Sequence, residues 1–583
     1  ELQKEYATNL LTHRNRYSGL RPIDDPAFVM IEICNEHGFF LYPEKLEVMV
    51  EPYRTNLLGM WNQWIRDTYG TRDKLKAFWG AWQGSTTLLP DEDPFGGTVK
   101  LPLISPPKKD TDKLDVLRSP TRVKDGVRFL YLVQQAYFKE MYTHLKTIGV
   151  KIPITAVVSN EILPDLLSVA NTCDFLAGNW YGEVERFDSR NPGVRYYSNR
   201  NPLRVDTSMS LAPFTSALHW NKKPVVIREF ATSSPNQWRG TTVPEMMAYA
   251  SFQDYDAVLL FAYQTNRAPN GMRANELNDY AFQSDPVVWG TYAVAGQAFL
   301  TRAIRPAKTN VVITLPEDYL FSGVTRIGNL YRASWSHGVR SVFAPPLNIM
   351  DYLSPVDRSK EAGQLVNYLT SKKTKLPVRP EAVYDSDWVS DTGEIRRITR
   401  GGRLEITTSR LRVLSGDFLP NRIYDLGGGI RFTTPTAIAT LMIYSLDGRP
   451  IQTSKHLWVK MVSKAENTGQ RLVPAGDNAI SEYMLKVPGS APVLTYGKPS
   501  KQATMLWLNP NQKGENCAVA MWMQDGTWEI EVNHNKVKVS CDTPGVVGKT
   551  FGSKFETNDG LIELTLKEPV RVSGTRPKTE TMN

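Results

Sequence analysis

Apolar segments of strand length recur through the first half of the chain. Residues 27–34 form a nearly continuous apolar run, which is typical of a parallel strand covered on both faces. Residues 127–149 instead carry apolar residues at helical spacing. Strands that alternate with helices predict an α/β fold with a parallel sheet. The further strand-length runs lie at residues 153–158, 174–178, 224–227 and 257–262.

The pattern changes after Pro306. Period-two alternation takes over, as in residues 527–532, and Asp447-Gly448 and Asp525-Gly526 are hairpin signals. We therefore expect three regions: an α/β domain, a connecting region and an all-β sandwich domain. Their expected ranges are 1–305, 306–380 and 381–583.

Composition narrows the class of protein. The 583 residues are 41% hydrophobic and 22% charged, as in globular proteins. The net charge of +9 comes from basic residues scattered among acidic ones, which argues against a nucleic-acid interface. No apolar run approaches the ~18 residues that a membrane span needs.

Four cysteines are too few for a disulfide scaffold. Cys517 and Cys541 could pair in an exported protein, and the sequence leaves this open. No metal-binding or cofactor-binding motif has the spacing and context that it needs, so we expect neither a metal nor a cofactor.

Two carboxylates stand at the ends of apolar runs. Glu36 follows residues 27–34, and Glu229 follows residues 224–227. Catalytic residues of (β/α)₈ enzymes lie at the carboxyl ends of barrel strands, and a carboxylate pair there could hydrolyse a glycosidic bond. The Asn35-Glu36 dipeptide has a rival in Asn160-Glu161, which also follows an apolar run.

Strand order distinguishes Asn35-Glu36 from Asn160-Glu161. Counted back from residues 257–262 as an eighth strand, residues 27–34 are the fourth and Glu229 ends the seventh. The chain thereby resembles clan A, the retaining (β/α)₈ glycoside hydrolases that include cellulases, mannanases and β-galactosidases. In that clan the acid/base Glu follows an Asn on strand four and the nucleophile ends strand seven. The resemblance implies these roles for Glu36 and Glu229, whereas Glu161 would lie on strand five.

The resemblance also implies substrate-binding residues. Asn35 would bind the 2-hydroxyl of the sugar, and Tyr181 would hydrogen-bond the nucleophile, although Asn179 stands where the clan often has His. His37 could line the cleft. Aromatic residues would stack on the sugar. The full set of expected binding residues is Asn35, His37, Asn179, Trp180, Tyr181 and Tyr263, with Phe261 beside them.

Strict alternation along the two catalytic strands assigns their side chains to faces. It places Glu32, Cys34 and Glu36 on one face of the first strand. It likewise places Val225, Ile227 and Glu229 together on the other strand. We expect Glu32 to be structural, because a carboxyl directed into a barrel needs a polar partner.

Only strands four to eight of such a barrel are present, which predicts a partial (β/α)₈ barrel followed by a β-sandwich. We expect a second polypeptide or an upstream segment to supply the first three strands, because open strand edges invite association. The function predicted is retaining hydrolysis of a β-linked poly- or oligosaccharide by an exported protein, extracellular or periplasmic. The alternative is a non-catalytic structural or carbohydrate-binding protein that reuses a glycosidase barrel.

Overall fold

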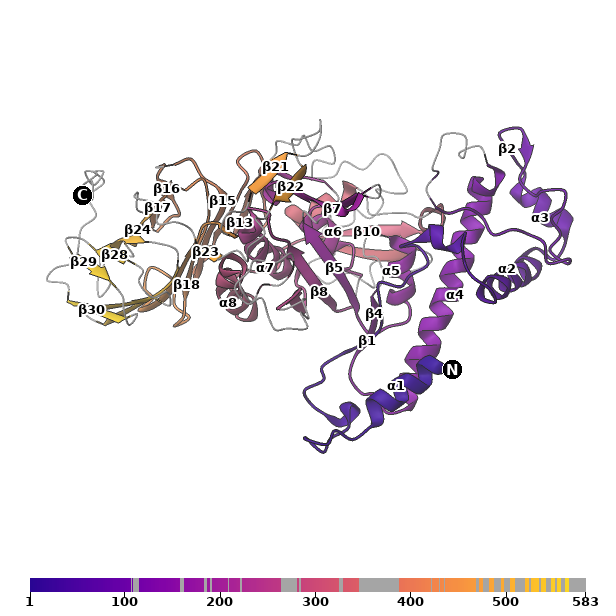
Figure 1. Cartoon of the computed structure of the whole chain (residues 1–583), viewed down its shortest axis with the longest axis horizontal. Helices are drawn as coiled ribbons and strands as arrows, with labels where there is room; N and C mark the ends of the chain where they lie inside the picture. Colours follow the sequence, from indigo (N-terminus) through magenta and orange to yellow (C-terminus); the bar gives the residue numbers. More distant parts are fainter. Residues whose placement is uncertain are drawn as a thin grey trace.

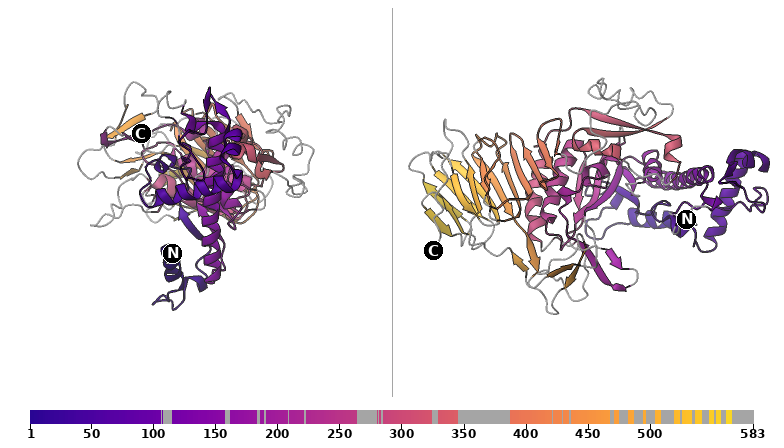
Figure 2. Two further views of the ribbon diagram at one scale, coloured as in Figure 1. Left: turned by 90° about the vertical axis from the view of Figure 1, so that its right-hand side faces the viewer. Right: turned by 90° about the horizontal axis from the view of Figure 1, so that it is seen from above.

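A computed structural model shows an elongated molecule (Figures 1 and 2). The α2–α3 region lies at one end, an α/β body in the middle and antiparallel sheets at the other end. The structure describes the chain apart from residues 106, 108–114, 158–161, 183–185, 189–190, 208, 221–222, 264–279, 281, 283–284, 324–328, 345–386, 421, 429 and 435, and beyond 467 it describes strand segments only, up to residue 565.

The body is built on a five-stranded parallel sheet. Its strands lie side by side in their order along the chain, β1-β4-β5-β8-β9. This order confirms that the fold is α/β with a parallel sheet. The strands span Ile31–Asn35 (β1), Ile154–Val157 (β4), Leu176–Gly182 (β5), Val225–Thr232 (β8) and Ala257–Leu260 (β9).

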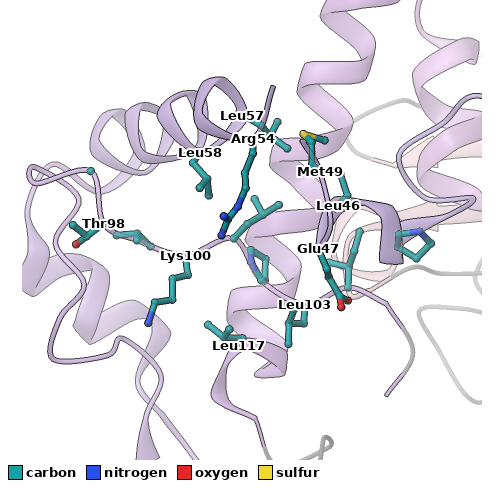
Figure 3. Close-up of a pocket in the computed structure, with 16 residues that line it drawn as sticks. Leu46, Glu47, Met49, Arg54, Leu57, Leu58, Thr98, Lys100, Leu103 and Leu117 are labelled. Atoms are coloured by element: carbon teal, nitrogen blue, oxygen red, sulfur yellow. The ribbon is translucent and has the colours of Figure 1, made fainter. Parts of the chain in front are cut away.

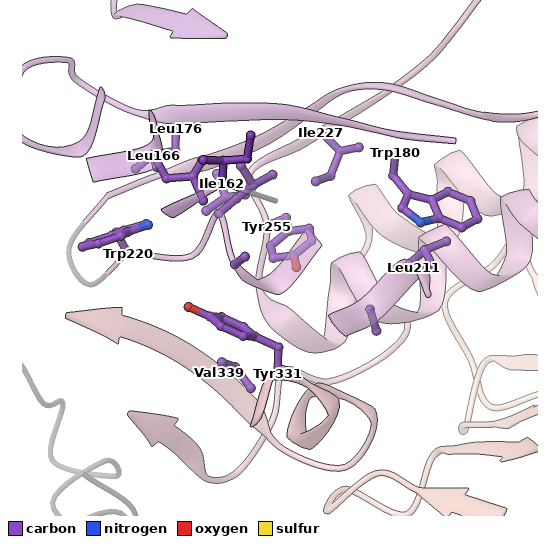
Figure 4. Close-up of a cluster of buried hydrophobic side chains, with 14 of the residues drawn as sticks. Ile162, Leu166, Leu176, Trp180, Leu211, Trp220, Ile227, Tyr255, Tyr331 and Val339 are labelled. Carbon is purple, nitrogen blue, oxygen red and sulfur yellow. The ribbon is translucent and has the colours of Figure 1, made fainter. Parts of the chain in front are cut away.

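Helices cover one face of this sheet and build the main core there. Ile227 and Trp180 project from the strands into this core, against Leu211 of α6 (Figure 4). Val258 and Leu260 pack on the same side, so this is the helix-covered face. The helices are α4 (Pro120–Thr147), α5 (Leu163–Ala170), α6 (Leu211–Ser216), α7 (Thr242–Gln253) and α8 (Pro286–Leu300), whereas α1 (Leu2–Thr12) packs against α4 in a separate small cluster.

The opposite, inner face carries a smaller apolar cluster. Phe175, Ala177 and Val226 are buried there, with Met30 and Ala257 beside them. Leu259 of β9, which alternates with the core-facing residues of its strand, is 45% exposed. The inner face is therefore only partly covered by the described part of the chain.

A long excursion separates β1 from α4. It contains α2 (Tyr53–Tyr69), α3 (Arg72–Trp79) and a short hairpin of β2 (Ala81–Trp82) and β3 (Ser85–Thr86). Glu92 and Arg122 form a fully buried ion pair that ties its loop to the start of α4. Asp125 of α4 accepts hydrogen bonds from Tyr69 and Trp79, both at 2.7 Å. These contacts anchor the excursion on the N-terminal part of α4.

Two strands that follow the central sheet in the chain also pack into the body. β10 (Asn310–Pro316) pairs in parallel with β11 (Gly338–Ala344). Val311, Ile313 and Val339 join the same core as the central sheet. The short helix α9 (Glu317–Leu320) follows β10.

The strands described after residue 386 form antiparallel sheets. A nine-stranded sheet has the order β12-β13-β14-β15-β18-β19-β26-β27-β30, and a six-stranded sheet has the order β16-β17-β24-β25-β28-β29. The strands of the first are Asp387–Val389, Ile395–Ile398, Arg403–Thr407, Leu411–Asp417, Ile438–Ser445, His456–Val462, Gly526–Asn533, Lys536–Cys541 and Leu561–Thr565. Those of the second are Tyr424–Asp425, Arg431–Thr433, Thr504–Leu508, Val519–Met523, Val547–Thr550 and Ser553–Glu556.

Two smaller sheets complete the described strands. One pairs β20 with β23, and the other has the order β21-β22-β7-β6. β22 pairs with β7, so a hairpin that follows β5 joins strands from the β-rich region. The strands span Ala465–Asn467 (β20), Leu494–Tyr496 (β23), Arg471–Pro474 (β21), Glu482–Lys486 (β22), Asn191–Ser198 (β7) and Arg186–Asp188 (β6).

Buried polar contacts join the first β-rich strands to the α/β body. Asp206 accepts a hydrogen bond from Trp388 at 3.0 Å and pairs with Arg332 at 2.5 Å. Arg397 is buried, pairs with Glu245 of α7 at 3.3 Å and lies over a tryptophan ring of the body. Because these groups have lost water, each depends on its partner across the junction.

Candidate active site

The expected catalytic carboxylates lie at one end of the central sheet. Glu229 is within β8, and Glu36 follows directly after β1. β5, which carries Asn179 and Tyr181, lies between β4 and β8 in the sheet. All strands are parallel, so their carboxyl ends meet at this edge. The structure thus gathers residues that are about two hundred positions apart in the sequence.

A β-bulge in β8 directs Glu229 to the inner face. Ile227 pairs with Gly178 of β5, but Glu229 pairs with the next residue, Asn179. Arg228 is therefore an extra residue, and a bulge re-aims side chains at such a position. The side chain of Ile227 points into the helix-covered core. The side chains of Arg228 and Glu229 both lie on the inner face, where they form the contacts described below.

A second bulge lies in β1. Glu32 pairs with Thr155 of β4, and Asn35 pairs with Val157, so two residues of β1 oppose one of β4. Ile33 and Cys34 pack toward the helices, while Glu32 and Asn35 contact Arg228.

The two bulges correct the alternation expected from the sequence. Cys34 does not share a face with Glu32, and Ile227 does not share one with Glu229. Strict alternation was wrong at both strands because an inserted residue reverses the side-chain parity beyond it. Without the insertion in β8, Glu229 would point under the helices.

A chain of hydrogen bonds and ion pairs connects the two carboxylates. Asn179 donates a hydrogen bond from Nδ2 to Glu36 Oε1. Its Oδ1 accepts a hydrogen bond from Arg228 Nη2 at 3.1 Å. Arg228 also forms an ion pair with Glu229 Oε1. Glu36 and Glu229 are therefore connected through one amide and one guanidinium, although they come from different parts of the chain.

Tyr181 completes the polar contacts of Glu229. Its hydroxyl donates a hydrogen bond to Glu229 Oε2. Burial, with the carboxylate beside it, raises the pKa of Tyr181 far above its ordinary value, so the hydroxyl keeps its proton. The ring packs edge-on against Tyr280 and Phe261, with centroids 5.4 Å and 6.1 Å away. The expected contact between Tyr181 and Glu229 is thus present in the structure.

Glu32 is a third carboxyl in this cluster. Its Oε2 lies 3.4 Å from Arg228 Nε, and its Oε1 is buried without a hydrogen-bond partner among the described residues. Burial raises the pKa of Glu32 to about 7; Arg228 opposes the rise, and Glu229 and Glu36 add to it. This carboxyl therefore exchanges its proton near neutrality.

Asn35 and His37 flank Glu36 at the end of β1. Asn35 Oδ1 accepts a hydrogen bond from Arg228 Nη2 at 2.6 Å. His37 is exposed and contacts the backbone carbonyl of Asn35 through Nδ1. Glu36 itself has a positive φ of 50°, which turns the chain sharply out of the strand.

The aromatic residues expected in one cleft are divided by the structure. Trp180 is 4% exposed and lies in the helix-covered core, because it alternates with Asn179 and Tyr181 along β5 (Figure 4). Phe261 does contact Tyr181. Tyr263 is 62% exposed and packs against Trp289 of α8. The structure therefore does not bring Trp180 to the carboxylates.

Two cavities lie near the excursion between β1 and α4. One, of about 450 Å³, borders Glu36 and His37 and is walled by Tyr42 and Tyr137 among others. The other, of about 420 Å³, is mainly apolar, and Arg54 of α2 reaches into it (Figure 3). Leu46 and Met49 line both. The first cavity is thus the one adjacent to a candidate catalytic residue.

Several sequence expectations lie outside the described residues. These include the rival pair Asn160-Glu161 and the side chains of Cys517 and Cys541. Within the described residues, no cluster of His, Cys, Asp and Glu could hold a metal ion. None of the helices there is both long enough and apolar enough to span a membrane.

Sequence reasoning missed two members of the site. Arg228 directly precedes Glu229, but strict alternation directs it away from the interior. Tyr280 follows a polar stretch, and only the fold brings it against Tyr181. The position of Arg228 beside a strand-end carboxylate was a signal that could have identified it. The sequence carries no such signal for Tyr280.

No family model matches the chain, and no curated protein matches its sequence. Among solved structures it is similar to the β-galactosidase of the Antarctic haloarchaeon Halorubrum lacusprofundi, at 13% identity over 73% of this chain and 75% of that one, with a TM-score of 0.35. It is also similar to the cold-adapted β-galactosidase of Rahnella sp. R3 (13% identity, 87% and 74% covered, TM-score 0.33) and to the β-galactosidase of Bacillus circulans sp. alkalophilus (12%, 97% and 80%, 0.38). Likeness at this level is too distant to assign a function, so the function has to rest on the geometry of the site.

Proposed function

We propose that the chain carries the catalytic residues of a retaining glycoside hydrolase that acts on a β-linked poly- or oligosaccharide. The observation that carries the proposal is the convergence of Glu36 and Glu229 on one Asn179–Arg228 pair. Two carboxylates brought together from distant strands, one of them held by a cation and a phenol, suit a double displacement.

In the first step, a Glu229 oxygen attacks the anomeric carbon while Glu36 gives its proton to the glycosidic oxygen. The bond to the leaving group breaks, and a glycosyl ester forms on Glu229. In the second step, Glu36 takes a proton from water, the water oxygen attacks the anomeric carbon, and Glu229 is released. This two-step mechanism requires a separation of roughly 5–5.5 Å between the two carboxyl groups, and we include that separation in the proposal.

The contacts of each residue fit its proposed role. Arg228 and Tyr181 both stabilise the negative charge on Glu229, which has to be ionised to attack. Among the described residues, the Glu36 carboxylate has a single hydrogen bond, from a neutral amide, and it borders the cavity of about 450 Å³. The leaving group needs space beside the acid, and this cavity provides it.

We further propose that the five-stranded sheet is the strand-four-to-eight part of a (β/α)₈ barrel and that the antiparallel sheets form a sandwich. Among the described residues, β1 and β9 each pair with a single strand of the sheet. Three more β/α units, from a second polypeptide or from another segment, would pair with both edges and cover the exposed inner face. A polysaccharide substrate favours an extracellular or periplasmic location.

Hydrolysis of a panel of alkyl β-glycosides, whose leaving oxygens need a proton, tests the proposal. We expect Glu36→Gln and Glu229→Gln to lose about 10³-fold or more in kcat/KM while remaining folded. The matched control is Glu140→Gln, because Glu140 lies on α4 in an exposed ion pair with Lys4. Nuclear magnetic resonance of the first-formed sugar should show the β-anomer. Equal activity of all three variants would refute the assignment, and a first-formed α-anomer would refute the retaining mechanism.

A further inference from the structure

The cavity of about 420 Å³ in the excursion between β1 and α4 is separate from the candidate active site, since neither Glu36 nor Glu229 lines it (Figure 3). Its volume is within the range of small-molecule sites, roughly 300–1,000 Å³. None of the described residues that line it is aromatic, and most are aliphatic, among them Leu46, Leu57, Leu58, Leu103, Ile104 and Leu117. Walls of this kind suit an alkyl chain, which gains by leaving water.

Buried polar contacts give the walls of this cavity a defined place. Asn62 of α2 donates a hydrogen bond to the carbonyl of Val99 at 3.0 Å, and its side-chain oxygen accepts one from the Val99 amide at 2.9 Å. Arg118 donates to the carbonyl of Leu103 at 3.3 Å. Val99 and Leu103 both line the cavity, so the segment that carries them is fixed beside α2.

Three charged side chains line the cavity, and two of them are engaged elsewhere. Lys100 pairs with Asp91 at 3.2 Å, and Glu47 accepts a hydrogen bond from Ser105. Arg54 is the third, and within the described part of the chain its side chain forms neither an ion pair nor a hydrogen bond. Figure 3 shows its guanidinium directed in among the lining side chains, apart from Glu47.

Helix stability does not explain an arginine at position 54. The residue lies in the first turn of α2, where a cation opposes the helix dipole. Glu51, which precedes this turn, accepts hydrogen bonds from the backbone and the hydroxyl of Thr55, at 3.2 Å and 2.7 Å, instead of pairing with Arg54. The planar guanidinium matches the two oxygens of a carboxylate, which it binds through parallel hydrogen bonds.

We propose that this cavity binds a medium-chain alkyl carboxylate, with the chain against the aliphatic walls and the carboxylate on Arg54. The chain contributes through the loss of its contact with water, and the charged head contributes through the guanidinium. A short carboxylate lacks the first contribution, and an uncharged chain lacks the second. The inference is independent of the proposed function, because it involves neither Glu36 nor Glu229.

Isothermal titration calorimetry of the full chain tests the site with octanoate, butyrate and 1-octanol. We expect octanoate to bind with a Kd of about 1 mM or tighter, and butyrate at least about tenfold more weakly, because each buried methylene tightens binding about threefold. Arg54→Met should weaken octanoate binding about tenfold and leave 1-octanol within about twofold. The control is Arg16→Met, which removes an exposed arginine outside the cavity and should change neither. Absence of octanoate binding, or equal octanoate affinity of wild type and Arg54→Met, would overturn the inference.

Nuclear magnetic resonance of protein labelled with ¹³C at the methionine methyls locates the bound chain. The Met49 resonance, identified by its loss in Met49→Leu, should shift as octanoate is added, because Met49 lines the cavity. Met60, on the exposed side of α2 and identified in the same way, should not shift. Met49 also lines the cavity beside Glu36, whereas Arg54 lines only the proposed site. A Met49 shift that persists unchanged in Arg54→Met would therefore place the chain in the other cavity and overturn the inference, whether or not the protein hydrolyses glycosides.

Discussion

At the scale of single residues, the hydroxyl of Tyr181 is the neutral donor to Glu229. Tyr181→Phe removes this donor and keeps the ring that packs on Tyr280 and Phe261. We expect kcat to fall about 10- to 100-fold, since hydrogen bonds to charged groups are worth roughly 1.5–3 kcal/mol. Steady-state kinetics on an aryl glycoside would measure the loss. Tyr53→Phe, on an exposed face of α2, is the control. Equal rates for the two variants would remove Tyr181 from the mechanism.

Glu32 gives the folded state a pH dependence of its own. Its pKa is raised to about 7 in the folded protein, against an ordinary value of 4.5. The folded form therefore holds a proton that the unfolded chain has released, and stability from this group is complete below about pH 4.5 and lost as the pH rises to about 7. The melting temperature of wild type should fall over this pH interval more than that of Glu32→Gln. Parallel curves for both proteins would show that Glu32 titrates normally.

At the scale of secondary-structure elements, the sequence was informative about strands and uninformative about their irregularities. The apolar runs at residues 27–34 and 224–227 both contributed strands to the parallel sheet, with Glu36 directly after β1 and Glu229 within β8. The predicted faces of the side chains on these strands were wrong. A bulge depends on pairing with a neighbouring strand and leaves no trace in the periodicity of one strand. Trp180 was misplaced for a related reason, since alternation assigns it to the face opposite Tyr181.

The excursion between β1 and α4 depends on one buried ion pair. Glu92 and Arg122 are both fully buried, and Arg122 Nη1 also donates to the backbone of Thr87 at 2.9 Å. Glu92→Ala leaves the guanidinium without its carboxylate, which typically costs about 3–5 kcal/mol. Denaturant unfolding would measure this loss. Asp91→Ala, which breaks the neighbouring exposed pair with Lys100, should change stability little. Similar effects of the two substitutions would mean that the buried pair does not hold the excursion.

At the scale of the whole molecule, the central sheet has two edges that an additional polypeptide could occupy. β1 and β9 are the edge strands, and Leu259 is exposed on the inner face. We expect the protein isolated from its natural source to contain polypeptide with three further β/α units, because open edges and an uncovered apolar face favour association. Mass spectrometry of the intact particle would identify it. A soluble monomer of this chain alone that unfolds cooperatively would contradict the expectation.

The most direct test of the central claim is covalent trapping of the nucleophile. A 2-deoxy-2-fluoro-β-glycosyl fluoride forms the glycosyl ester quickly and hydrolyses slowly, because fluorine destabilises both transition states but the fluoride leaving group speeds the first step. A panel of such sugars, incubated with the intact particle and analysed by peptide mass spectrometry, should label Glu229. Glu229→Gln should remain unlabelled, and Glu36→Gln should still accept the label. A label on any other residue, or none with any sugar of the panel, would contradict the assignment of Glu229 as the nucleophile.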